Sequence, residues 1–177
     1  MKQLTKLISS VLFVVALMTM SANAQTMKIG YVDDQRILNE NKAWIKAQEE
    51  WQIESKAWQD EAQQKQTEIQ DLYAEYEKQK LILSDEKRKE KEAAIRTKEQ
   101  ALDLYTRTIF GPGGSAEKKQ DMLTRPILET VTKAIEAVAI EGNYDVIFTV
   151  NGSGLGYIKE VYDITQKVID YLENNEQ

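Results

Sequence analysis

Few side chains in this sequence are of the types that usually carry catalysis, because its 177 residues include no His and no Cys. The chain therefore lacks the usual proton shuttle, the commonest metal ligand and any thiol nucleophile. Ser84-x-x-Lys87 and Ser115-x-x-Lys118 match the spacing of a serine–lysine nucleophile, but no companion motif accompanies either of them. We therefore expect no enzyme activity, no metal site and no cofactor.

The aromatic side chains are better placed for binding than for catalysis. Trp44, Trp51 and Trp58 are seven residues apart, so on a helix they lie along one face. Tyr73 and Tyr76 continue that face at helical intervals. Such a stripe is typical of a seam between two helices, and its large rings also suit a surface that binds a ligand. We hypothesise that the tryptophans do both.

A second candidate surface is a basic stretch from Lys78 to Lys98, which holds eight Lys and Arg against four Asp and Glu. It carries +4 on a chain whose formal net charge is −6. Either this stretch is ordinary solvated helix, or it makes electrostatic contact with acidic partner proteins or anionic lipid. Its densest part is Lys87-Arg88-Lys89-Glu90-Lys91.

Both surfaces belong to a long helical arm, which the Gln-, Glu-, Lys- and Ala-rich sequence of residues 34–140 predicts. Residues 34–82 as one helix would span roughly 70 Å, so the arm should reach away from any compact body. Ser84 can cap a new helix, which predicts an antiparallel hairpin with its tip near residues 82–84. Three glycines and a proline at 111–114 predict a break in the returning helix.

The two ends of the chain, residues 25–33 and 141–177, are expected to form a small body. Residues 27–32 and 144–150 are predicted strands, and a glycine-rich turn should return the chain into a third strand at 155–158. A short helix is expected to close the chain over residues 164–172. The predicted fold class is α+β, mostly helical, with a long antiparallel helical hairpin on a small β body.

Residues 1–24 predict a cleaved secretory signal. Lys2 and Lys6 precede an apolar run of about fourteen residues, shorter than the ~20 needed to span a bilayer. Cleavage is expected after Ala24, at a small-residue site, and would place the mature chain outside the cytoplasm. Cleavage leaves 21 basic against 29 acidic residues, a formal net charge of −8 that argues against nucleic acid as a partner.

The expected body is too small to be stable alone, because three strands and a short helix bury little apolar surface. Unpaired sheet edges in such a body favour contact with another copy of the chain. We therefore expect subunits to pair through their sheets. The strand residues expected at that contact are Ile29, Tyr31, Val146, Phe148, Val150 and Tyr157.

The order of these elements, together with both ends of the mature chain, resembles the Skp/OmpH family of periplasmic chaperones. The stretches that carry the resemblance are Lys28-Ile29-Gly30-Tyr31-Val32-Asp33, Gly142-Asn143-Tyr144-Asp145-Val146-Ile147 and Tyr162-Asp163-Ile164-Thr165-Gln166-Lys167-Val168-Ile169. The resemblance implies a homotrimer, in which the strands form a shared β-barrel and the hairpins hang as tentacles around a cavity. It also implies that unfolded outer-membrane proteins are held in the cavity without ATP.

On this resemblance, the aromatic stripe and the basic tip become candidate client-binding residues. Two features depart from the best-known members of the family, which are basic and have uninterrupted tentacles. This chain is acidic, and its glycine-rich break suggests a joint or bulge partway along the arm. The alternative interpretation is a coiled-coil spacer or scaffold of the cell envelope that binds no clients.

Overall fold

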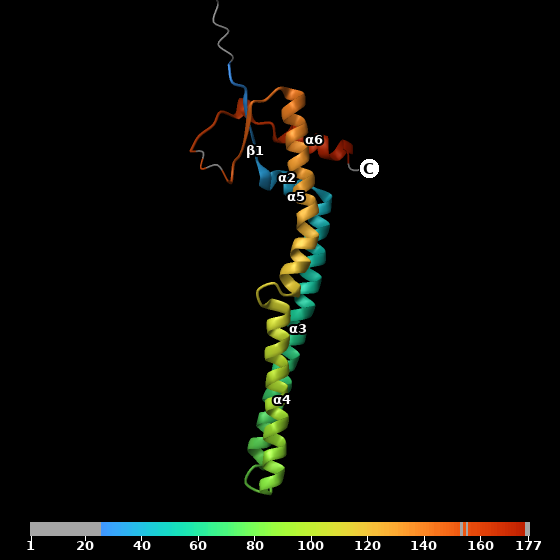
Figure 1. Cartoon of the computed structure of the whole chain (residues 1–177), viewed down its shortest axis with the longest axis vertical. Helices are drawn as coiled ribbons and strands as arrows, with labels where there is room; N and C mark the ends of the chain where they lie inside the picture. Colours follow the sequence, from blue (N-terminus) through green and yellow to red (C-terminus); the bar gives the residue numbers. More distant parts are fainter. Residues whose placement is uncertain (1–25, 153, 155, 176–177) are drawn as a thin grey trace, which may run out of the picture.

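The computed structural model describes residues 26–152, 154 and 156–175, and it consists of a long helical arm below a small body (Figure 1). The predicted leader and its cleavage site at Ala24 lie outside the described residues. The elements in chain order are β1 (Ile29–Val32), α2 (Asp34–Glu40), α3 (Lys42–Gln79), α4 (Asp85–Phe110), α5 (Ser115–Gly142), β2 (Val146–Thr149), the 3₁₀ turn η1 (Glu160–Tyr162) and α6 (Thr165–Asn175).

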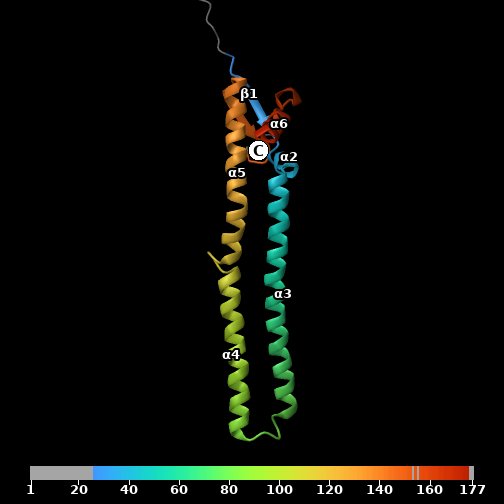
Figure 2. The same cartoon turned by 90° about the vertical axis from the view of Figure 1, so that its right-hand side faces the viewer.

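The arm is an antiparallel helical hairpin, which confirms the predicted fold class. α3 runs down one side for 38 residues, about 57 Å at 1.5 Å per residue, and α4 and α5 return along the other side (Figure 2). The chain turns between the end of α3 and Ser84, whose side chain accepts a hydrogen bond from the Lys87 backbone N–H at 3.3 Å. Ser84 is therefore the N-cap of α4, as its position in the sequence predicts.

The outgoing helix is not continuous from residue 34, and this part of the prediction is wrong. Asn41 is extended (φ −77°, ψ 118°) and separates α2 from α3. Its side-chain oxygen accepts from the Trp44 backbone N–H at 2.8 Å, so it caps α3 where a continuous helix would have needed a helical residue. The break lets α2 lay Ile37 and Leu38 into the body while α3 leads away from it.

The returning side of the arm is interrupted at residues 111–114, between α4 and α5. Gly113 adopts a left-handed φ of 69°, and its N–H donates to the Glu117 carboxylate at 2.7 Å. The Gly114 N–H donates to the Gly111 carbonyl at 2.8 Å, which closes the turn. α3 passes this point without a break, so only one of the two sides of the arm has a joint here.

The sheet pairs β1 with β2 in parallel, with Ile29 opposite Val146 and Tyr31 opposite Phe148. On its other side β1 contacts the chain before α6, because the Ile164 N–H donates to the Tyr31 carbonyl at 2.9 Å.

The predicted third strand at 155–158 is absent from its described part, residues 156–158. Leu155 lies outside the described residues. After β2 the chain crosses to the far edge of β1, where Asp163 bridges Tyr31, and residues 156–158 do not pair with β2. The outer edge of β2 therefore has no strand partner among the described residues.

The apolar core lies in the body and at the head of the arm. It brings together β1, α2, α5 and α6, with partly buried Trp44 and Tyr144 packed against it. Between residues 48 and 130, all of which the structure describes, the buried apolar side chains are Ile69 and Ile95. The core residues are Val32, Ile37, Leu38, Val131, Ala134, Val138, Ile164, Val168, Ile169 and Leu172.

We predict that Ile37→Ala destabilises the protein by about 2–5 kcal/mol, because Ile37 is 1% exposed and its loss leaves a cavity. The matched control is Ile53→Ala in α3, where the side chain is 73% exposed and the change should stay within about 0.5 kcal/mol. Urea unfolding followed by circular dichroism measures both variants. Equal losses in the two variants would contradict this placement of the core.

Candidate functional site

The tryptophan stripe lies on the inner side of the upper arm, and each of its three rings is half-buried. Trp44 packs against the body core. Trp51 and Trp58 meet edge to face, with ring centroids 6.1 Å apart and planes at 72°. The rings are thus partly packed and partly accessible, which is compatible with both roles hypothesised for them.

A groove of about 480 Å³ runs beside this stripe, between α3 and α5. Apart from the ring edges, its walls are mostly amides and small polar or apolar groups, and Glu49 is the charged residue among them. The groove is therefore less charged than the chain as a whole, which is 29% charged. The lining residues are Asn39, Trp44, Ile45, Ala47, Gln48, Glu49, Trp51, Gln52, Gln120, Leu123 and Thr124.

The residues on the α5 side of this groove were not predicted from the sequence. Gln120, Leu123 and Thr124 show no motif, and they join the groove because the returning helix lies beside α3. Counting equal numbers of residues from the hairpin tip along the outgoing and the returning helix would have placed them opposite residues near Trp51.

The two tyrosines of the predicted stripe are engaged across the seam between α3 and α4. The Tyr73 hydroxyl donates to Glu99 at 2.8 Å, and the Tyr76 hydroxyl donates to Glu92. These hydrogen bonds raise the pKa of both phenols. Tyr73 nevertheless remains 44% exposed.

A third tyrosine, Tyr105 of α4, donates its hydrogen bond from α4 to α3, the reverse of Tyr73 and Tyr76. Its hydroxyl donates to Glu61 at 3.0 Å and approaches the Trp58 carbonyl at 3.3 Å. Burial, followed by the bond to Glu61, raises the pKa of Tyr105. The ammonium of Lys65 lies 5.2 Å from the Tyr105 ring centroid, which adds a cation–π contact across the seam.

Ion pairs also join the two sides of the arm. Lys91 contacts Glu75 at 2.8 Å, and Lys98 contacts Glu68 at 2.6 Å. The hydrogen bond and charge of Lys91 lower the pKa of Glu75. Nearer the body, Lys119 of α5 contacts both Glu50 (2.6 Å) and Glu54 (2.8 Å) of α3. The seam is therefore mainly polar.

The predicted basic residues at the tip are mostly paired with acids. Lys87 contacts Glu90, Arg88 contacts Asp85, and Lys91 contacts Glu75. Lys89 makes no ion pair with the described residues.

The side chains of the tip turn itself were not predicted as a binding surface, but they are exposed. Leu81 is 92% exposed and Ile82 is 86% exposed, at the end of the arm farthest from the body. The tip therefore combines exposed apolar side chains with a surrounding excess of basic residues.

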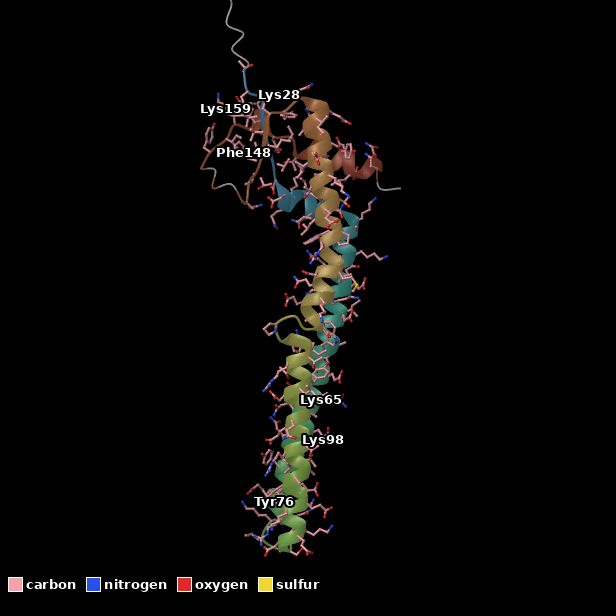
Figure 3. All side chains as sticks on the ribbon, in the orientation of Figure 1. Lys28, Lys65, Tyr76, Lys98, Phe148 and Lys159 are labelled. Carbon is pink, nitrogen blue, oxygen red and sulfur yellow. The ribbon has the colours of Figure 1, made fainter. Side chains whose placement is uncertain are left out.

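The residues predicted for subunit contact gather on the body. Ile29 and Tyr31 alternate with buried Gly30 and Val32, so they lie on the face of β1 that the core does not cover. The parallel register of β1 and β2 places Val146 and Phe148 of β2 on the same face. Figure 3 labels Phe148 on the body.

Apolar exposure continues beyond this face. Val150 is 41% exposed and Tyr157 is 82% exposed. Ile140, at 70%, and Val161, at 79%, border a hollow of about 880 Å³ beside the start of β1. These side chains extend the uncovered apolar surface of the body.

Two other kinds of site were sought. In the described ranges, no cluster of three or more acidic side chains is arranged to hold a metal ion. Within the same part of the chain, none of the helices combines the length and the apolar character needed to cross a bilayer.

Comparison with known proteins identifies relatives of this fold. The family of outer membrane proteins described as OmpH-like matches residues 28–172. The crystal structure of a candidate outer membrane chaperone (OmpH-like) from Caulobacter crescentus CB15 matches with a TM-score of 0.69 at 11% identity. The match covers 84% of this chain and 85% of that one. No curated protein matches the sequence.

We predict that the contact between α3 and α4 weakens on both sides of neutral pH. The lowered pKa of Glu75 means that its pair with Lys91 contributes fully above pH 4.5, and that this contribution is lost as the pH falls through the lowered value. The raised pKa of Tyr73 means that its bond to Glu99 contributes fully below pH 10.0 and is lost as the pH rises through the raised value. Tyrosinate absorbance should therefore show Tyr73 titrating at lower pH in Glu99→Gln than in the unaltered protein.

Tyr73→Phe serves as the control for this titration, because its difference spectrum isolates the signal of that phenol. Identical curves for the unaltered protein and Glu99→Gln would show that Glu99 does not perturb Tyr73.

Proposed function

Because this chain belongs to the OmpH-like outer membrane protein family, we propose that it is a chaperone that holds unfolded outer-membrane proteins without ATP. The OmpH-like chaperone candidate of Caulobacter crescentus CB15, whose structure this chain resembles, supports that role. We further propose that it works in the periplasm, after removal of residues 1–24.

The observation that carries this proposal is the groove beside Trp44 and Trp51. Half-exposed indole rings provide apolar contact, and the surrounding amides of Gln48, Gln52 and Gln120 can donate to and accept from a peptide backbone. Strands of outer-membrane barrels alternate apolar and polar side chains. A nearly uncharged groove with rings and amides suits such a chain while it is still extended.

We propose that the protein is a homotrimer whose strands share a β-barrel. The uncovered face of Ile29, Tyr31, Val146 and Phe148 supports this assembly, because a second sheet laid on it would bury four apolar side chains. The unpaired edge of β2 supports it as well, since an exposed strand edge favours pairing with another chain. Three arms would then surround one space.

Holding would be multivalent. Each arm offers a shallow surface with low affinity, and three arms around one client raise the local concentration of binding sites. An unfolded client loses entropy on ordering, so many weak contacts suit it better than one tight pocket. Release then requires no nucleotide, since the client leaves when it folds or inserts elsewhere.

We predict that Trp51→Ala weakens holding. Removing a partly buried tryptophan from a binding surface should cost at least about 1 kcal/mol, or roughly fivefold in affinity. The measurement is the chaperone concentration that halves the aggregation of a denatured outer-membrane barrel protein on dilution from urea. Met122→Ala in α5, where the side chain is 69% exposed and outside the groove, is the matched control and should change nothing.

The same assay separates the chaperone from the envelope spacer. A spacer would leave the barrel protein to aggregate at stoichiometric amounts, whereas a holding chaperone keeps it soluble. Equal activity of Trp51→Ala and the control would remove the groove from the binding surface.

The residues at the tip of the arm favour a second contact, with lipid, that is weaker than client holding. We propose that exposed Leu81 and Ile82, within a stretch of net charge +4, touch anionic lipid surfaces. The protein should sediment with phosphatidylglycerol vesicles more than with phosphatidylcholine vesicles, and added salt should reduce the difference. The double variant Leu81→Ser/Ile82→Ser should reduce sedimentation, and equal sedimentation with both lipids would exclude the contact.

A further inference from the structure

Helix α4 is set apart from the rest of the arm by a loop at each of its ends. The turn after α3 precedes it, and the glycine-rich break at 111–114 follows it. The break separates α4 from α5, which is anchored in the body core through Val131, Ala134 and Val138. A change in backbone torsions at these two loops could therefore move α4 while α5 stays in place.

The contact that holds α4 against α3 is weak in apolar burial. Over residues 58–110, all of them described, the buried apolar side chains are Ile69 and Ile95. The other contacts are made by partly buried apolar side chains such as Leu72 and Leu102, and by hydrogen bonds and ion pairs between partly exposed groups. In one such pair, Lys91 and Glu75 are 33% and 52% exposed at their side chains. Water can replace such contacts at small cost.

Each helix has stabilising contacts of its own that do not depend on the other. In α3, Lys56 pairs with Asp60 at 3.0 Å one turn away. In α4, Arg107 pairs with Asp103 at 2.8 Å, and the Ser84 cap starts the helix. Pairs at this spacing support isolated helices. Separation of α3 and α4 would therefore leave two rods rather than an unfolded segment.

Separation would uncover an apolar stripe on each rod. On α3 the stripe contains Ile69, with partly buried Leu72 and Trp58 on the same face. On α4 it contains Ile95 and partly buried Leu102. The groups released from the seam, such as Glu99 and Lys98, remain beside these stripes and can bond to a peptide backbone.

We propose that α4 detaches from α3 about the two loops, and that the α3 stripe it uncovers is a covered binding surface for extended apolar segments of an unfolded protein. This inference rests on the proposed chaperone function, and it adds a site that is closed in the unloaded arm. The occupant is an extended, uncharged segment, because the uncovered stripe is apolar and its flanking groups are matched in charge. Local opening of a weakly packed element supplies the access.

The absence of cysteine makes a direct test practical. Glu68→Cys/Lys98→Cys places one thiol on each side of the seam, where the native pair is 2.6 Å apart. A bismaleimide linker with a reducible bond then ties α3 to α4. Gln59→Cys/Gln63→Cys carries the same linker within α3 alone, between two exposed residues one turn apart, and is the matched control.

The expected result is that the linked seam variant needs a several-fold higher concentration to suppress aggregation of a denatured barrel protein. Cleaving the linker should restore holding, and the control should be unaffected throughout. Spin labels on Glu68→Cys/Lys98→Cys should report a broader and longer distance distribution when the barrel protein is added.

Unchanged holding by the linked seam variant would overturn the inference and leave the chaperone function standing. An equal loss in the linked control would also overturn it, because the effect would then come from the linker. A failure of the unlinked, unaltered protein to hold the barrel protein would remove the chaperone function, and the inference with it.

Discussion

Apolar side chains are buried mainly in the body, whereas most of the length of the molecule lies in the arm, and the rest of the structure depends on this division. The core of ten apolar side chains sits where β1, α2, α5 and α6 meet, and the arm beyond it buries little besides Ile69 and Ile95. The arm therefore obtains its length from long helices with ion pairs along their own surfaces, and its pairing mainly from polar groups and partly buried side chains across a seam. A polar seam holds two rods in register without the strong cohesion of a packed core.

The same separation leaves the body incomplete. β1 is covered on one face by the core, but Ile29 and Tyr31 on its other face lie beside Val146 and Phe148 and are only partly buried. A monomer would keep this face and the exposed apolar side chains around it in water. The proposed contact with further copies of the chain would cover this face, and it would also bring several arms side by side. The proposed assembly and the proposed client binding would then follow from one arrangement.

The sequence predicted what depends on local pattern and missed what depends on distant contacts. Apolar periodicity, the Ser84 cap and the proline and glycines at 111–114 are local signals, and they indicated the hairpin and its interruptions. Asn41 was read as part of a helix, because its role as a cap depends on α2 having to turn into the core. The predicted third strand is absent from residues 156–158, and the chain instead crosses from β2 to the opposite edge of β1. No turn signal at residues 151–154 can reveal that crossing.

In the proposed binding surface, too, local patterns were predicted and distant contacts were not. The tryptophan stripe follows from a spacing of seven residues, whereas Gln120 and Thr124 enter the groove only through the register of the hairpin. The pairing of Tyr73 with Glu99 was hidden for the same reason, since a tyrosine on an apolar stripe gives no sign of its hydrogen-bond partner.

The central claim is that copies of this chain join through the uncovered sheet face so that their arms enclose one space. Native mass spectrometry of the mature protein tests it most directly, alone and after addition of one denatured outer-membrane barrel protein. The account predicts three chains alone, and three chains with a single client bound. A protein that stays as single chains under both conditions would contradict it.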